Sequence, residues 1–243
     1  MTKPNDLYPE KLVGGYSRVD GTIEFYLRLG ELVHSNHIVV DVGAGRGMIH
    51  TDRSQSIHAR LMNFKGRCRK VIGVDIDPAV YQNTSLNEAH LFDGERLPLE
   101  DESADVIFSD WVLEHVEHPS RFVSEIQRVL KPGGWFCART PNLWGYIGIA
   151  TNAVPNTLHT KVLKVAQPER KRIDVFPTFY RMNSERRLRN VFPKESWQLI
   201  AYRIFSEPAY FGQSKLFMRA AQVMFRLTPP GLEPVLLVFA RKT

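Results

Sequence analysis

The sequence has little cysteine, no long apolar run and no internal repeat, and each absence excludes a class of protein. Its two cysteines, Cys68 and Cys137, are too few for a disulfide framework, and neither has a second ligand at the spacing of a metal site. The sequence has no run of about eighteen apolar residues, the length needed to cross a membrane, and its amino terminus lacks the apolar core of a signal peptide. We therefore expect free thiols, no metal site and a cytoplasmic protein.

What the sequence does contain is an ordinary globular composition with unevenly placed charge. Its 243 residues are 43% hydrophobic and 24% charged, which suits one α/β domain with a core that needs no disulfides. The formal net charge is +6, yet residues 161–194 alone hold ten Lys and Arg against three acids. Such a cluster can attract phosphate, nucleic acid or an anionic membrane, or it can be a solvated face, and both interpretations remain open.

Apolar, β-branched runs alternate with helical patterns along most of the chain. The runs predict strands at 37–40, 70–77, 104–109, 135–139, 197–205 and 235–241. Helices are predicted from about residue 22, through 119–130 with a stop at 131–134, over 184–191 and over 214–226. This alternation favours a parallel sheet with crossover helices. We expect a single domain over 1–243, with a cofactor-binding core at 30–142 and a substrate cap from 143–183 and 206–232.

A glycine-rich turn follows the first of these strands, in the segment Val-Val-Asp-Val-Gly-Ala-Gly-Arg-Gly over 39–47. Glycines are needed where a ligand approaches the backbone closely. The turn lacks the small residue that a dinucleotide dehydrogenase has at its third position, where Met48 follows Gly47, and its candidate ribose acid lies too far along the chain. It also lacks the Gly-Lys-Ser/Thr of a P-loop. Both of these nucleotide-binding classes are therefore disfavoured.

Four pieces in order, spanning close to half of the chain, resemble the class I S-adenosylmethionine-dependent methyltransferases, and among them small-molecule methyltransferases of the type 11 kind. The pieces are 41–47, 71–77, 92–99, and 109–116 with 130–134. The resemblance implies a Rossmann-like, mostly parallel seven-stranded sheet flanked by helices, with a helical and loop cap after strand five. It also implies S-adenosylmethionine as the cofactor.

The resemblance assigns cofactor contacts to ten positions, namely Asp41, Gly43, Ala44, Gly45, Asp75, Ile76, Asp93, Gly94, Ser109 and Asp110. Asp75 would take both ribose hydroxyls, because a carboxylate only accepts hydrogen bonds and can receive two at once. Asp93 would receive the adenine amino group, and the backbone amide after it would meet a ring nitrogen. The glycine turn would pass under the methionine part of the cofactor, which Asp41 would help to orient.

Local chemistry offers other roles for several of these residues. Asp41 could instead cap the turn after it, and Asp93 could stabilise a turn with Gly94. Arg46 could approach the cofactor carboxylate or face solvent. A longer basic stretch than the family usually has separates the glycine turn from the second strand, and its polar residues could shape the cofactor entrance or form an exposed loop. These unassigned residues are His50, Asp52, Arg53 and His58.

Methyl transfer requires alignment of the acceptor with the methyl group, and a proton acceptor where the nucleophile is an O–H or N–H group. His115 is the first candidate for that base, although a packing or helix-capping role competes with it. Asp110 is the second catalytic candidate, placed to face the cofactor or acceptor. Three residues of the predicted cap are weaker candidates, namely His159, Asp174 and Tyr180.

These observations predict methyl transfer to a small molecule, most plausibly to an oxygen of a sugar, glycolipid or secondary metabolite. Basic and aromatic residues over 158–181 would bind an anionic or sugar-bearing acceptor. One alternative is C-methylation of a quinone-like lipid at a membrane surface, and another is a non-catalytic, cofactor-binding partner subunit. No nucleic-acid-binding signature is present, so a specific nucleic acid is not expected, and peripheral membrane contact is not favoured.

Overall fold

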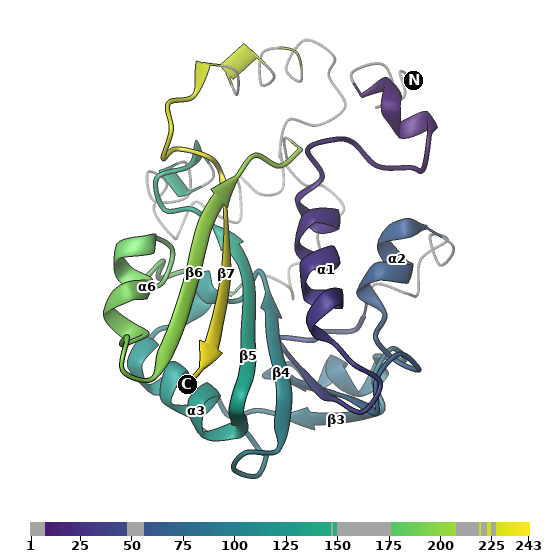
Figure 1. The fold of residues 1–243 in the computed structure, drawn as a ribbon, viewed down its shortest axis with the longest axis vertical. Helices are drawn as coiled ribbons and strands as arrows, with labels where there is room; N and C mark the ends of the chain where they lie inside the picture. The colour runs from purple at the N-terminus through teal and green to yellow at the C-terminus, as the bar shows by residue number, and fades with distance from the viewer. Residues whose placement is uncertain are drawn as a thin grey trace.

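The computed structural model describes residues 8–47, 56–146, 148–149, 176–207, 219, 223–224 and 227–243. Its centre is a seven-stranded sheet in the order β3-β2-β1-β4-β5-β7-β6 (Figure 1). The first five strands run parallel, and β7 lies antiparallel between β5 and β6. The predicted fold class, a Rossmann-like and mostly parallel sheet of seven strands, is confirmed.

The elements follow one another as the sequence alternation predicted. The strands are β1 Ile38–Val42, β2 Lys70–Asp75, β3 Glu88–Leu91, β4 Ala104–Asp110, β5 Leu130–Pro141, β6 Trp197–Ile204 and β7 Val235–Lys242. The α-helices are α1 Gly21–Leu32, α2 Ile57–Met62, α3 Pro119–Val129 and α6 Glu185–Val191. Short 3-10 helices are η2 Pro9–Leu12, η4 Pro78–Gln82 and η5 Leu113–His115.

Helix ends follow local capping chemistry. Asp20 precedes α1 and its carboxylate accepts the amides of Thr22 and Ile23, while Ser184 caps α6 as the sequence predicted. The third helix was predicted through residue 130 with a stop at 131–134, and α3 ends at Val129, one residue earlier. Residues 131–134 belong to β5, at a point where its register with β4 shifts between Ala104 and Val106 and Gly133 has a φ of +78°.

Helices cover both faces of the sheet and bury two separate apolar cores. α3 and α6 contribute Ile126 and Leu188 to one core, whereas α1 contributes Phe25 and Leu29 to the other. Consecutive strand residues alternate between them: Val39 faces the α1 core and Val40 the α3 core. Figure 1 shows α1 and α3 on opposite sides of the strands. Both faces being buried, the strands are nearly continuously apolar, which is why the sequence revealed them.

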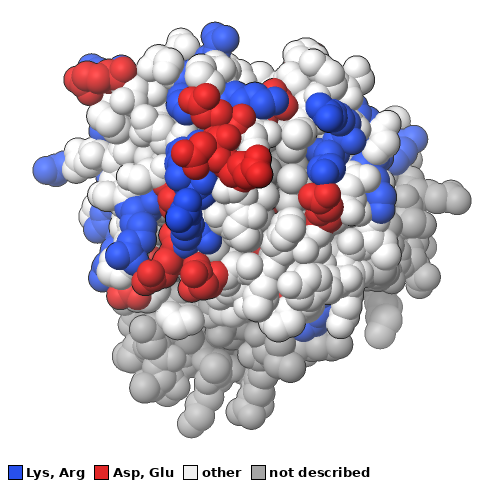
Figure 2. Space-filling model, turned by 90° about the horizontal axis from the view of Figure 1, so that it is seen from below, with Lys and Arg blue, Asp and Glu red and all other residues white. Residues whose placement is uncertain are grey.

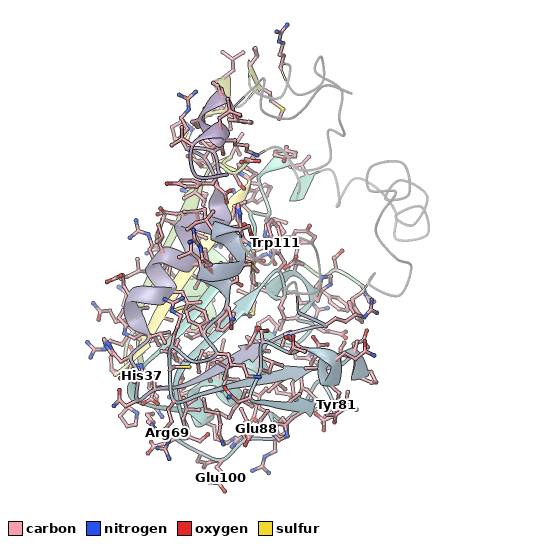
Figure 3. All side chains as sticks on the ribbon, turned by 90° about the vertical axis from the view of Figure 1, so that its right-hand side faces the viewer. His37, Arg69, Tyr81, Glu88, Glu100 and Trp111 are labelled. Carbon is pink, nitrogen blue, oxygen red and sulfur yellow. The ribbon has the colours of Figure 1, made fainter. Side chains whose placement is uncertain are left out.

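The two edges of the parallel strands differ in chemistry. Seen from below, the amino-terminal edge carries Lys, Arg, Asp and Glu side by side (Figure 2). Ion pairs join several of them, for example Lys70 with Glu88 at 2.7 Å and Lys131 with Asp105 at 2.8 Å. In Figure 3 His37, Arg69 and Glu100 mark this edge, and Trp111 lies towards the opposite one. Mixed, paired charges make the amino-terminal edge a solvated surface, which leaves the other edge for a ligand.

One strand was not predicted from the sequence, and several predicted features lie outside the described residues. The strand β3 was not predicted, because Glu-Ala-His-Leu at the edge of the sheet is exposed or half-buried and has no apolar run. Most of the helix predicted at 214–226 and most of the cap over 143–175 lie outside the described residues, as do His50, Asp52, Arg53, His159 and Asp174. Among the described residues, no helix is long and apolar enough to span a membrane.

The α3 core gives a direct test of the packing. Ile126 is fully buried, so Ile126→Ala should lower the free energy of unfolding by about 2–5 kcal/mol through lost apolar burial and the cavity left behind. Leu27 on α1 is 50% exposed, and Leu27→Ala should cost less than about 1 kcal/mol. Chemical denaturation of the two variants measures this difference. Equal losses would show that α3 does not pack as described.

Candidate functional site

A cavity of about 710 Å³ opens at the carboxyl ends of the parallel strands. Asp75, which ends β2, and Asp93, which follows β3, line one end of it. Trp111, His115 and Phe179 line the other end, beyond β4. In open α/β sheets ligands bind outside the carboxyl ends of the strands, and this volume suits a small molecule.

The glycine turn brings bare backbone to the cavity. Gly43 has a φ of +82°, and a β-carbon there would lie 2.3 Å from Cγ2 of Val112. Gly45 has a φ of +51°, lines the cavity, and has no atom within 4 Å of the position of a β-carbon. Asn83 fixes the turn by donating from Nδ2 to the carbonyls of Ala44 at 3.0 Å and Gly45 at 3.3 Å. The turn therefore holds space for a ligand against the backbone, and Asn83, which no sequence pattern indicated, fixes its shape.

Asp75 is held rigidly at the end of β2. One carboxylate oxygen accepts the amide of Gly45 at 2.8 Å and the other accepts the amide of Asp77 at 2.8 Å. Each oxygen keeps a second lone pair for an O–H donor. Ile76, next to it, is 51% exposed and also lines the cavity. A fixed acceptor pair beside an apolar surface fits a ribose and the ring attached to it, the role that the resemblance implied.

Asp93 stabilises a turn and lines the cavity at the same time. Its Oδ1 accepts the amides of Arg96 and Glu95, at 3.0 and 2.8 Å, and these bonds lower the pKa of Asp93. The turn role considered from the sequence is therefore present. Asp93 and Gly94 both line the cavity, so their adenine contacts stay a prediction compatible with the turn.

Three predicted cofactor residues lie off the cavity. Asp41, Ala44 and Ser109 are not among the residues that line it. Ser109 is fully buried, and its Oγ has no hydrogen-bond partner among the described residues. Their contacts with a cofactor remain predictions that this geometry does not support directly.

Asp41 lies on β1 between the strands that carry Asp75 and Asp110. Removal of its carboxyl group from water raises the pKa of Asp41 from 3.8 to about 8, and the negative charges of Asp110 and Asp75 add to the rise. Asp41 is therefore largely protonated at neutral pH. A positive charge brought near these acids would favour its ionised form.

Asp110 is already paired at the end of β4. Nε and Nη2 of Arg139 lie 2.7 Å from its two carboxylate oxygens, and the hydroxyl of Tyr26 donates to Oδ2 at 3.1 Å. Asp110 lines the cavity, yet a proton-accepting role would compete with this pairing, so its catalytic role remains a prediction that the geometry counts against. Arg139 was missed from the sequence. Its signal was a charged residue in an apolar strand, in register with the acid that ends β4.

His115 has one tautomer fixed by its neighbour. Its Nδ1 lies 2.7 Å from the carbonyl oxygen of Pro177, and a carbonyl can only accept, so Nδ1 carries the hydrogen. In the neutral ring Nε2 then holds the lone pair. The ring also makes an edge contact with Phe176, which lines the cavity as Pro177 does. In its neutral form His115 would therefore accept a proton at Nε2, as a general base does.

The segment 176–183 forms one wall of the cavity by docking on the residues around His115. The amide of Phe179 donates to the carbonyl of Glu114 at 2.8 Å, and a guanidinium nitrogen of Arg181 donates to the carbonyl of Glu117. Phe176, Pro177 and Phe179 line the cavity. This segment is one described part of the predicted cap, and it supplies aromatic surface to the end of the cavity beyond β4.

Two of the three remaining candidates do not line the cavity. Tyr180 is buried, with a φ of +53°, and is not among the residues that line the cavity. His58 pairs with Asp20 at the start of α1, with 2.7 Å between Nε2 and Oδ2. Arg46 does line the cavity. Among the described residues, no group of three or more His, Cys, Asp or Glu is placed to hold a metal ion.

The raised pKa of Asp41 makes stability depend on pH. Between about pH 4 and pH 8 the folded protein holds a proton on Asp41 that the unfolded chain has released. The contribution of Asp41 is therefore most favourable below pH 4 and is lost as pH rises towards 8. Asp41→Asn removes this dependence. The free energy of unfolding of the variant minus that of the native protein should therefore increase from pH 5 to pH 8. Denaturation at both pH values measures the difference, and a constant difference would show that Asp41 is ionised throughout.

Comparison with known proteins agrees with this site. The family model described as a methyltransferase domain matches residues 40–138, which contain the glycine turn, β2 to β4 and most of β1 and β5. A probable S-adenosylmethionine-dependent methyltransferase of Mycolicibacterium smegmatis is 30% identical over 69% of this chain and 66% of its own length. The dimethylglycine N-methyltransferase of Parasynechococcus marenigrum is 27% identical over 50% of this chain and 44% of its own length.

The chain thus spans 66% or less of each of these two relatives. Among solved structures, an S-adenosylmethionine-dependent methyltransferase from Mesorhizobium loti matches with a TM-score of 0.55 at 17% identity, over 91% of this chain and 98% of that one. This likeness shows the shared fold. The matched methyltransferase domain and the 30% identity to the Mycolicibacterium smegmatis relative assign the family: the chain belongs to the class I S-adenosylmethionine-dependent methyltransferases.

Proposed function

We propose that the chain transfers the methyl group of S-adenosylmethionine to a hydroxyl oxygen of a small molecule, namely a sugar, a glycolipid or a secondary metabolite. The observation that carries this proposal is the tautomer of His115. His115, whose Nδ1 donates to the carbonyl of Pro177, lines the same cavity as Gly45, Asp75 and Asp93, and its neutral ring would accept a proton at Nε2. A proton acceptor at that place suits an O–H nucleophile.

The described residues fit the cofactor. S-adenosylmethionine supplies a methyl group on a positively charged sulfonium. The open space at Gly45 accommodates a ligand against backbone, and Asp75 presents two fixed acceptors to a ribose. Asp41 and Asp75, on adjacent strands, give this edge of the sheet a preference for positive charge. Asp41, Asp75 and the glycine turn would therefore bind and orient the cofactor.

The acceptor end supplies orientation and exclusion of water. Trp111, Phe176 and Phe179 provide aromatic surface on which a sugar ring or an apolar ring can pack. Holding the acceptor hydroxyl in line with the methyl group supplies much of the rate enhancement. His115 would receive the hydroxyl proton. The basic excess of residues 161–194 in the sequence supports an acceptor that also carries a negative charge.

The first prediction concerns the cofactor. Asp75→Ala should weaken binding of S-adenosylhomocysteine by about 1–3 kcal/mol, because charge-assisted hydrogen bonds to the ribose are lost. Glu88→Ala is the control, since Glu88 is exposed at the amino-terminal edge and pairs with Lys70. Isothermal titration calorimetry measures both. Unchanged affinity in a folded Asp75→Ala protein would remove Asp75 from the site.

The second prediction concerns the base. His115→Ala should lower kcat for methyl transfer by about 10²–10⁴-fold, because the acceptor proton loses its acceptor. Its affinity for S-adenosylhomocysteine should stay unchanged. A loss of less than about tenfold, or a fall in melting temperature large enough to explain the lost activity, would return His115 to a packing role.

The acceptor class can be tested directly. The protein is incubated with S-adenosylmethionine carrying a radiolabelled methyl group and an extract of an organism that carries the gene. We expect label in the small-molecule or glycolipid fraction, in a methyl ether that hot hydriodic acid releases as methyl iodide. Label in protein or nucleic acid would contradict a small-molecule acceptor. A methyl group that resists hydriodic acid would favour the C-methylation alternative.

A further inference from the structure

Trp111 occupies a backbone conformation that bulky residues rarely adopt. It follows β4 with a φ of +60°, in the left-handed region that is costly for a side chain with a β-carbon. Such a conformation persists only where the surrounding structure enforces it, and it is most frequent at functional sites. Trp111 lines the acceptor end of the cavity. Whatever enforces this conformation therefore also shapes that end.

One residue, Arg139 of β5, contacts both the backbone and the ring of Trp111. The amide of Trp111 donates to the carbonyl of Arg139 at 2.8 Å. The guanidinium carbon of Arg139 lies 5.5 Å from the centre of the Trp111 ring, within the range of a cation–π contact. Two constraints from one neighbour fix the direction of the backbone and the plane of the ring.

Arg139 is itself held by α1 and β4. It forms a two-pronged ion pair with Asp110, and its Nη1 donates to the hydroxyl of Thr22 at 2.6 Å. Tyr26, one turn further along α1, donates to Asp110 at 3.1 Å. The side chains of Arg139 and Asp110 are only 7% and 14% exposed. Arg139 of β5 and Asp110 of β4 thus bond to each other, and each also bonds to a residue of α1.

Stability alone does not account for such a cluster. Taking an Arg and an Asp out of water costs about as much free energy as their attraction returns, so apolar residues of similar size would often serve as well. What the ion pair provides is geometry, because the planar guanidinium fork fits a carboxylate in one orientation. In that orientation the guanidinium also lies over the rings of Trp111 and Phe25, at 5.5 and 5.9 Å from their centres.

We propose that Arg139 is a positioning residue for the acceptor site: clamped by Asp110, Thr22 and Tyr26, it fixes Trp111 as a rigid wall against which the acceptor packs. The proposal rests on the proposed function in placing the acceptor at this end of the cavity. It assigns to α1, which precedes the glycine turn in the sequence, a part in acceptor selection. It also makes Asp110 a positioning residue for Arg139, in place of a base.

The clamp can be tested without knowing the acceptor. The full chain is labelled with fluorotryptophan, which gives one fluorine NMR signal for each of its four tryptophans, and Trp111→Phe identifies the signal of Trp111. In Arg139→Met the Trp111 signal should move and broaden, because the ring loses the guanidinium that lies 5.5 Å from its centre, while the main-chain carbonyl of residue 139 still accepts the amide of Trp111. Arg139→Lys should have a similar effect, since an ammonium group lacks the planar fork.

A matched control exists on β7. Arg241 of β7 lies 5.9 Å from the ring of Trp135. Arg241→Met should change the signal of Trp135 and leave that of Trp111 in place. If Arg139→Met loses all four dispersed signals, and so its fold, Arg139→Lys and Asp110→Asn carry the test under the same criterion. An unchanged Trp111 signal in a folded Arg139 or Asp110 variant would overturn the proposal.

Calorimetry separates this proposal from the proposed function. Arg139→Met should bind S-adenosylhomocysteine within about twofold of the native protein, because Arg139 acts at the acceptor end. A loss as large as that of Asp75→Ala would mean that Arg139 serves the cofactor, and the proposal would fail. If the native protein bound no S-adenosylhomocysteine, the proposed function would fail, while the fluorine signals would still report on the clamp.

Discussion

Three carboxyl groups converge at the carboxyl ends of β1, β2 and β4, and the site depends on how their mutual repulsion is relieved. Adjacent parallel strands place Asp41, Asp75 and Asp110 at the same edge of the sheet. A different interaction acts on each carboxyl group. Asp110 pairs with Arg139, Asp75 accepts two backbone amides, and Asp41 keeps its proton because its pKa is raised to about 8. The edge is thus arranged for a ligand that brings positive charge.

This constraint divides the cavity into two parts with different tasks. At the β2 and β3 end, bare glycine backbone and fixed oxygen acceptors determine which ligand can enter. At the β4 end the wall is aromatic, and the charged groups behind it act through Trp111. Because Asp110 is engaged by Arg139, we propose His115, whose Nδ1 donates to Pro177, for the proton-accepting role. The two candidates considered from the sequence would then have separate roles.

Much of the fold was predictable, because strands buried on both faces are continuous apolar runs. The glycine turn and Asp75 could be found for a related reason, since both directly follow or end such runs. The features that were missed depend on contacts between distant segments. The strand β3 has no apolar run, and the pairing of Arg139 with Asp110 follows from the register between β4 and β5. Asn83, which supports the glycine turn, is 38 and 39 residues away in the sequence from the two residues whose carbonyls it binds.

The central claim is that this edge of the sheet is a binding site for S-adenosylmethionine. The most direct measurement is a crystal structure of the protein with S-adenosylhomocysteine. The account predicts the ligand in the cavity, with its ribose at Asp75, its adenine towards Asp93 and its sulfur directed to the end formed by Trp111 and His115. A ligand bound elsewhere, or a ribose held by other residues, would contradict it.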